Sequence, residues 1–135
     1  MKLVEVNNEL RNNYKNTVII MKYGNFYRCF YNNALIMNYI FNYKINETRI
    51  GFPISIINNV INTLDELNIG YLIYNKENDI KYNIHKDNNY EVYLEKAIEK
   101  NNRDNMIKEL NDNIIYLLNK DISNYNKIKE YINGL

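Results

Sequence analysis

The hydrophobic pattern changes its period at Asp87-Asn88-Asn89, and this change constrains the fold more than any other feature of the sequence. Before it, short runs of β-branched and aromatic residues alternate with polar turns, which is typical of strands interleaved with helices. After it, apolar residues recur every three or four positions up to Leu135, without proline and without a strand-like run. The pattern predicts an α+β fold, with a mixed β-sheet flanked by helices over residues 1–88 and a helical tail over residues 89–135.

Five segments before the change have the composition of strands. Residues 17–23 and 26–31 flank Gly24-Asn25, a dipeptide suited to a tight turn, so these two segments are predicted to form a hairpin. Three further strands are expected at residues 43–50, 71–74 and 80–84. The pattern therefore fits a sheet of about five or six strands.

Helices are predicted between these strands. A short helix should end near Tyr14, and residues 34–41 are apolar on nearly every side, as in a deeply buried helix. Pro53 suits the first turn of a helix that runs to Leu67. Gly70 is a candidate left-handed cap at the end of that helix.

The tail is predicted to contain two or three helical segments, with a break near residues 121–123. One apolar stripe in it has coiled-coil-like spacing and comprises Ile107, Leu110, Ile114, Leu117 and Leu118. Because two heptads alone form a marginal coiled coil, the stripe could be the seam of a homodimer or could pack within one chain as a helical hairpin. The sequence leaves both alternatives open.

Composition limits the cellular context and the partners. The formal net charge is +1, so the chain has no global basicity that would indicate strong non-specific binding to nucleic acid. A single cysteine cannot form an internal disulfide, which favours a reducing compartment. The amino terminus lacks the apolar core of a signal peptide, and no apolar run approaches the roughly 20 residues of a membrane span. A soluble, cytoplasmic protein without a membrane partner is therefore expected.

No set of residues has the spacing of a catalytic or metal centre. His85 is the single histidine and lies at a polar strand end, while Cys29 lies in the middle of a strand without a neighbouring histidine. No two titratable residues form a convincing acid–base or nucleophile pair. The sequence thus predicts a protein that is not an enzyme and that has no catalytic residue, metal or cofactor.

Two blocks of the sequence carry a resemblance to a known family. The first is the apolar strand at residues 18–23, then Gly24-Asn25-Phe26-Tyr27-Arg28-Cys29-Phe30, then Asn33-Ala34 at the start of a helix. The second is Gly51-Phe52-Pro53, an amphipathic helix, and Gly70-Tyr71 before a further apolar strand. Over about residues 10–80 this order resembles domain I of MutS, the mismatch-recognition domain, whose first block reads Gly-Asp-Phe-Tyr-Glu-x-Phe followed by Asp-Ala.

The resemblance implies a site at the hairpin. In the family the phenylalanine wedges beside a mispaired base and the glutamate two residues later hydrogen-bonds that base. Phe26 matches the wedge, but Arg28 stands at the glutamate position and Asn25 at the aspartate position. A guanidinium can only donate hydrogen bonds, so mismatch reading of the family kind is not expected. The resemblance therefore implies Gly24, Asn25, Phe26 and Arg28 as nucleic-acid contacts, with structured or mispaired DNA as the partner.

Two functions follow from this resemblance. The first is a non-catalytic nucleic-acid-binding accessory module; it has no ATPase, because the chain lacks a Walker A pattern. The second is a protein–protein interaction or oligomerisation module that kept the fold and lost contact with DNA. Arg28 together with Lys22, Lys15 and Arg11 could form a basic surface that favours the first function, or could be scattered, solvated charges.

Overall fold

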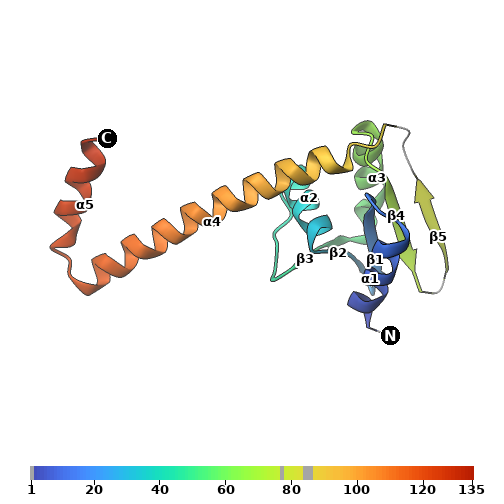
Figure 1. Ribbon diagram of the computed structural model, residues 1–135. Helices are drawn as coiled ribbons and strands as arrows, with labels where there is room; N and C mark the ends of the chain where they lie inside the picture. Colours follow the sequence, from blue (N-terminus) through green and yellow to red (C-terminus); the bar gives the residue numbers. More distant parts are fainter. Residues whose placement is uncertain (1, 77, 84–86) are drawn as a thin grey trace. The chain divides into compact units, whose positions relative to one another are not determined.

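The computed structural model describes residues 2–76, 78–83 and 87–135 of the chain. The elements follow one another in the order α1 (Leu3–Asn13), β1 (Val18–Tyr23), β2 (Phe26–Phe30), α2 (Asn32–Phe41), β3 (Arg49–Pro53), η1 (Ile54–Ile56), α3 (Ile57–Glu66), β4 (Tyr71–Asn75), β5 (Asn78–Asn83), α4 (Tyr90–Lys120) and α5 (Asn124–Asn133) (Figure 1). They form two compact units, Met1–Glu99 and Lys100–Leu135. The first unit ends eleven residues after residue 88, where the sequence analysis places the end of the first domain.

The first unit is built on a five-stranded mixed sheet in the order β3-β2-β1-β4-β5. The pairs β1–β2, β2–β3 and β4–β5 are antiparallel, whereas β1 and β4 are parallel. The predicted α+β fold with a mixed sheet, flanking helices and a helical carboxyl-terminal segment is therefore confirmed. The hairpin of β1 and β2 lies where the sequence places it, and β3 forms one edge of the sheet.

Helices cover both faces of the sheet, and a separate apolar core lies between the sheet and the helices on each face. Helices α2 and α3 and the first turns of α4 cover one face, and the core there includes Ile20, Cys29 and Leu64. Helix α1 covers the other face, where Leu10 packs on Ile19, Met21, Phe30 and Leu72. The buried residues Val18–Met21 contribute side chains to both cores, because successive side chains of a strand point to opposite faces.

The third strand and the helix after it lie later in the sequence than predicted. Residues 43–48 form a loop, and β3 spans Arg49–Pro53, with Ile50 and Phe52 buried and their neighbours exposed. Gly51 and Pro53 do not break this strand, because an edge strand tolerates proline. A single 3-10 turn follows, so α3 starts at Ile57 and not at Pro53.

The end of α3 uses a different left-handed residue from the predicted Gly70. Asn68 has φ 56°, and the amide of Ile69 donates to the carbonyl of Leu64 at 2.9 Å, while the amide of Asn68 donates to Asp65 at 3.1 Å. This pair of bonds is the Schellman motif, in which the residue after the cap packs on the last helical turn. Leu64 and Ile69 are both fully buried, so the helix stop also contributes to the core.

The predicted change of period at Asn88-Asn89 is a hydrogen-bonded junction. The Asn88 side-chain oxygen accepts from the amides of Gly70 and Tyr90, both at 3.1 Å, and its amide group donates to the carbonyl of Asn16 at 2.7 Å. The Asn89 side chain donates to the carbonyl of Leu67 at 2.9 Å. The two asparagines therefore tie the start of α4 to the loops before β1 and β4.

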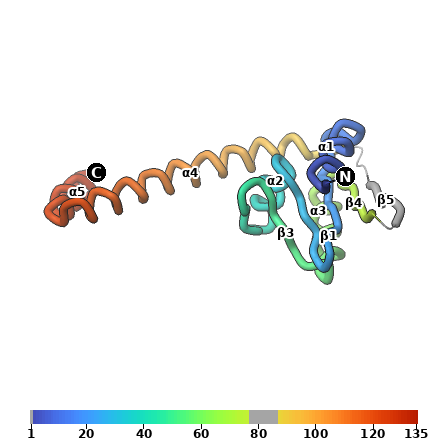
Figure 2. Tube along the Cα trace, turned by 90° about the horizontal axis from the view of Figure 1, so that it is seen from below, coloured from blue at the N-terminus to red at the C-terminus, as the bar shows by residue number. Residues whose placement is uncertain are grey.

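The tail consists of two helices. The predicted apolar stripe lies on α4, which has 31 residues. Figure 2 shows that this helix runs without a break. The predicted break near residues 121–123 separates α4 from α5, where the Asp121 carboxylate accepts from the amide of Ser123 at 2.9 Å. The predicted strand at residues 80–84 corresponds to β5, while Ile84 and His85 lie outside the described residues.

Candidate nucleic-acid interface

The turn of the β1–β2 hairpin presents the residues that the sequence singles out. Tyr23 pairs with Phe26, so Gly24 and Asn25 form a two-residue loop. Gly24 has φ 59° and is the only one of the two with a positive φ, which is the pattern of a type II′ turn. Glycine adopts this conformation without steric cost, and the turn matches the twist of the flanking strands. The hairpin therefore holds Tyr23 and Phe26 side by side at its tip.

Strand alternation decides which side chains of β2 face outward. Tyr27 and Cys29 belong to the core under α2 and α3, so Phe26, Arg28 and Phe30 point to the opposite face, which α1 covers. Phe30 is buried beneath α1, whereas Phe26 is 52% exposed and Tyr23 is 54% exposed. Helix α1 thus covers one end of this face and leaves the hairpin end open, with two aromatic rings accessible.

Arg28 stacks on the aromatic ring of Tyr23. The guanidinium carbon lies 4.0 Å from the centre of the Tyr23 ring. The register places Arg28 opposite Met21, so Tyr23 is its diagonal neighbour on the same face. A cation above an aromatic face is stabilised by the ring quadrupole, and this contact holds the guanidinium beside the exposed rings.

A hollow of about 390 Å³ lies beside Phe26 and Arg28 at the β3 edge of the sheet. Its lining comprises Phe26, Arg28, Tyr43, Lys44, Asn46, Arg49, Ile50 and Gly51. Gly51 pairs with Arg28 across the strands. Three cationic side chains and no carboxylate line the hollow, so its electrostatic potential favours an anion.

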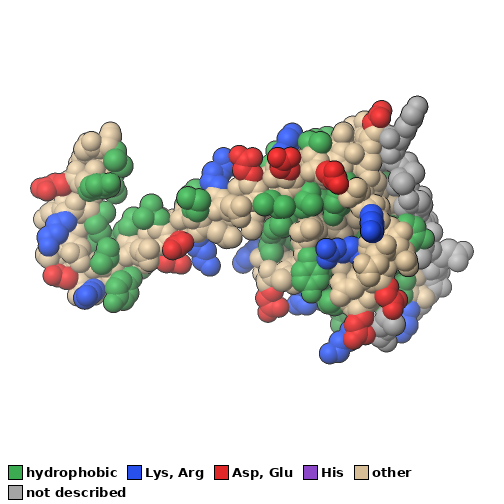
Figure 3. Space-filling model, viewed as in Figure 1, with side chains coloured by type: hydrophobic (Ala, Val, Ile, Leu, Met, Phe, Trp, Pro, Cys, Tyr) green, Lys and Arg blue, Asp and Glu red, His purple; other side chains and the backbone are tan. Residues whose placement is uncertain are grey.

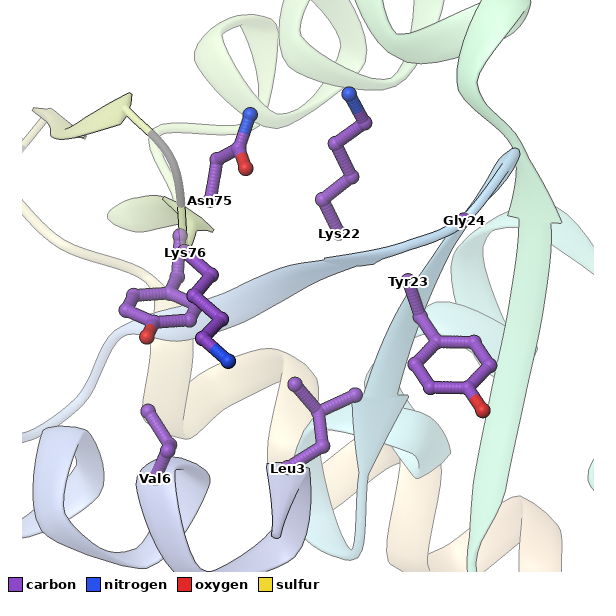
Figure 4. A pocket seen from close by; sticks show the side chains of 8 residues that line it. Leu3, Val6, Lys22, Tyr23, Gly24, Asn75 and Lys76 are labelled. Carbon is purple, nitrogen blue, oxygen red and sulfur yellow. The ribbon is translucent and has the colours of Figure 1, made fainter. Parts of the chain in front are cut away.

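A second hollow, of about 440 Å³, lies on the other side of Tyr23, between the hairpin, β4 and α1. Figure 4 shows the Tyr23 ring directed to the side of Leu3 and Val6, while Lys22 points to the opposite side of the strand. The charged residues in its lining are Lys22 and Lys76. Cations are therefore the charged groups that line both hollows beside the hairpin.

The structure does not gather the four cations that the sequence grouped with one another. Lys22 points away from the face of Arg28 (Figure 4), and Arg11 and Lys15 line a third hollow, of about 270 Å³, with Tyr90. The cations that do accompany Arg28 are Lys44 and Arg49. Sequence reasoning missed these two and Tyr23, although the pairing of Tyr23 with Phe26 follows from a two-residue turn.

The nucleophile considered in the sequence lies in the core. Cys29 is fully buried, and burial raises the pKa of its thiol, so the reactive thiolate is disfavoured. In the part of the chain that the structure describes, no group of three His, Cys, Asp or Glu residues could hold a metal ion. Among the same residues, no helix is both long and apolar enough to cross a membrane.

Comparison with known protein families supports the resemblance seen at the hairpin. The family model of MutS domain I matches residues 3–114, which is most of the chain. The match extends beyond the two sequence blocks and includes α1 and most of α4. No curated protein matches the chain.

Proposed function

Because this chain belongs to the MutS domain I family, we propose that it is a non-catalytic nucleic-acid-binding module whose contact surface runs from the tip of the β1–β2 hairpin along the β3 edge of the sheet. This hairpin surface comprises Tyr23, Phe26, Arg28, Lys44 and Arg49, with Gly24 and Asn25 forming its turn. The observation that carries the proposal is the half-exposed Phe26 ring between the Tyr23–Arg28 pair and a hollow lined by cations.

The two kinds of side chain on the hairpin surface have complementary roles. The Tyr23 and Phe26 rings offer faces on which unpaired bases can stack, and each such contact contributes about 1–3 kcal/mol in other systems. Arg28, Lys44 and Arg49 can contact the phosphates that flank a stacked base. Since the whole chain carries a net charge of only +1, binding should depend on these few cations and not on a general positive field.

Arg28 changes what the site can recognise. The family's glutamate accepts hydrogen bonds from a mispaired base, whereas the guanidinium of Arg28 donates to a phosphate or to an acceptor edge such as that of guanine. Ring stacking needs accessible base faces, which bulged, branched or single-stranded DNA presents without the cost of unstacking a duplex. We therefore infer a preference for bulged, branched or single-stranded DNA and no true mismatch reading.

The same proposal assigns no catalysis and no cofactor to the module and places its action in the cytoplasm. The buried Cys29 thiol supports a structural and not a nucleophilic role for that residue. The hairpin surface contains aromatic and cationic groups but no carboxylate or histidine that would act as a general base. Its chemistry is that of binding.

Phe26→Ala tests the proposal through fluorescence anisotropy with a labelled bulged DNA at low salt. Loss of one stacked ring should weaken binding by about 1–3 kcal/mol, which is roughly 5–150-fold. Tyr116→Ala is a matched control, since this ring is 64% exposed but lies in the second unit. Equal affinities of Phe26→Ala and the unmodified protein would exclude Phe26 as a stacking residue.

A second candidate function is a protein-interaction module that kept the family fold without binding nucleic acid. The observation that favours it is the large amount of apolar surface on residues 100–135, where eleven large apolar side chains are exposed. The two candidates differ in one measurement. If the full chain binds neither DNA nor RNA at tens of micromolar and low salt, only the interaction module stands.

A further inference from the structure

The second compact unit has no interior of its own. It comprises the distal part of α4 and all of α5, and none of the residues 100–135 is buried. Its exposed apolar side chains are Met106, Ile107, Leu110, Ile115, Tyr116, Leu117, Ile122, Tyr125, Tyr131, Ile132 and Leu135. Soluble monomers rarely leave apolar patches of more than a few hundred Å² uncovered, so this unit has the surface of an interaction site.

Part of this apolar surface forms a groove between the two helices. The hollow measures about 440 Å³, and its floor and walls include Leu110, Ile114, Leu117, Ile128, Ile132 and Leu135; we call it the tail groove. Figure 3 shows apolar side chains on the facing sides of α4 and α5. Protein interiors are packed as closely as organic crystals, so an open gap of this size between two helices can accept the side chains of a partner.

The spacing of the α4 residues fits helix-on-helix packing. Ile107, Leu110, Ile114 and Leu117 follow one another at intervals of three and four, the a and d positions of a coiled coil. These positions insert into the spaces between side chains of a facing helix. Within the second unit the partner of α4 is α5, which is only 10 residues long. The stripe therefore needs a further helical surface.

We propose that the tail groove is covered by the tail groove of a second copy of this chain, which makes the protein a homodimer. In a two-fold dimer each copy presents the same patch, and two helical hairpins facing each other form a four-helix arrangement with one apolar core. Five of the apolar side chains that line the groove are exposed in the single copy and are available to such a core: Leu110, Leu117, Tyr131, Ile132 and Leu135.

Charge also favours a second copy over a nucleic acid or a strongly charged protein as the occupant. Residues 100–135 contain six basic and five acidic side chains, so two copies of this unit do not repel each other. Lys127 is the one charged residue that lines the tail groove. An acidic or basic partner would find almost no complementary charge there, whereas an identical apolar groove is complementary in chemistry.

Analytical ultracentrifugation of the full chain tests this proposal with two variants on the same helix. Leu110→Glu places a charge in the tail groove and should weaken dimerisation by at least about 100-fold, because burying an unpaired carboxylate is costly. Ile115→Glu adds the same charge at a side chain that is 56% exposed and outside the groove, and should leave the dimer intact. Leu110→Ala is a milder groove variant, and circular dichroism monitors the helix content of all three.

Three results would overturn the proposal. A full chain that stays monomeric at several hundred micromolar has a groove with another occupant or none. A dimer that Leu110→Glu and Leu110→Ala leave unchanged uses a different surface. A dimer that Ile115→Glu weakens as much as Leu110→Glu does is centred outside the tail groove. None of these results depends on nucleic-acid binding at the hairpin surface.

Discussion

The two compact units have similar kinds of apolar residues but use them in opposite ways. In residues 1–99 helices cover both faces of a sheet, and side chains such as Ile20, Leu64 and Leu72 are fully buried. In residues 100–135 two helices leave their apolar stripes in contact with solvent. Apolar content alone therefore does not produce a core. A sheet with helices on both faces buries its apolar side chains, whereas a pair of helices leaves much of its apolar surface exposed.

The exposed surfaces of the two units also differ in their chemistry. The hairpin surface of the first unit combines two half-exposed aromatic rings with Arg28, Lys44 and Arg49, which suits stacked bases and phosphates. The tail groove of the second unit is apolar with a single cation, which suits another apolar helix pair. On the two proposals, the first unit binds a ligand and the second unit mediates self-association.

A leucine-to-alanine substitution should lower the free energy of unfolding far more in the first unit than in the second, and this is the largest effect that we expect. Leu64→Ala removes a fully buried side chain and should lower the free energy of unfolding of the first unit by about 2–5 kcal/mol. Leu110→Ala truncates a side chain that is 61% exposed. It should change the free energy of unfolding of the monomer by less than about 0.5 kcal/mol. Urea denaturation at low protein concentration measures both. Similar losses would contradict the distinction between a closed and an open unit.

Tyr90 connects the start of α4 to the rest of the first unit. Removing its hydroxyl should lower the free energy of unfolding by less than Leu64→Ala does. Its hydroxyl donates to the side-chain oxygen of buried Asn33 at 2.7 Å. Tyr90→Phe leaves that oxygen unsatisfied and should lower the free energy of unfolding by about 1–3 kcal/mol. If urea denaturation shows no loss, the start of α4 is not anchored in the first unit through this bond.

The pH dependence of the free energy of unfolding gives a second test of the role of Tyr90. Burial raises the pKa of Tyr90 from 10.0 to about 12. Above pH 10 the unfolded chain loses this proton more readily than the folded chain, so the free energy of unfolding should fall as the pH rises from 10 towards 12. The stabilisation is fully present below pH 10. Tyr90→Phe should show a shallower decline than the unmodified protein over this range, and identical slopes would contradict the burial of the hydroxyl.

A single cation of the hairpin surface should have the smallest effect. Arg28→Ala removes one of the proposed phosphate contacts, so the slope of log affinity against log salt should become shallower by about 0.7 for a single strand. Lys22→Ala removes a cation from the neighbouring strand that points to the opposite side (Figure 4), and should leave the slope unchanged. Anisotropy titrations at several salt concentrations distinguish the two variants, and equal slopes would remove Arg28 from the interface.

The local features of the fold could be predicted from sequence, because short-range chemistry decides them. Gly24-Asn25 permits a two-residue turn between two strand-like runs, and the register of the hairpin follows from that turn. The change of period at Asn88-Asn89 likewise marks the start of α4. At the end of α3, however, Asn68 and Gly70 both suit a left-handed conformation, and the buried contact of Leu64 with Ile69 decides between them.

The features that depend on distant parts of the chain could not be predicted. Gly51 and Pro53 resemble strand breakers until β3 is known to lie at a sheet edge. Lys44 and Arg49 join Arg28 only because β3 pairs with β2, so their contribution to the hairpin surface is a consequence of tertiary structure. Phe26 and Arg28 could be assigned to one face from strand alternation, but the contact of Arg28 with Tyr23 required the diagonal geometry of the folded hairpin.

The most direct test of the nucleic-acid proposal is the affinity of the full chain for a labelled single-stranded or bulged DNA at two salt concentrations. We expect binding at tens of micromolar or below in low salt. With three cations in the interface, the affinity for a single strand should fall with a log–log slope of about −2 as salt increases. Absence of binding to DNA and RNA at tens of micromolar, or binding that salt does not weaken, would contradict the account.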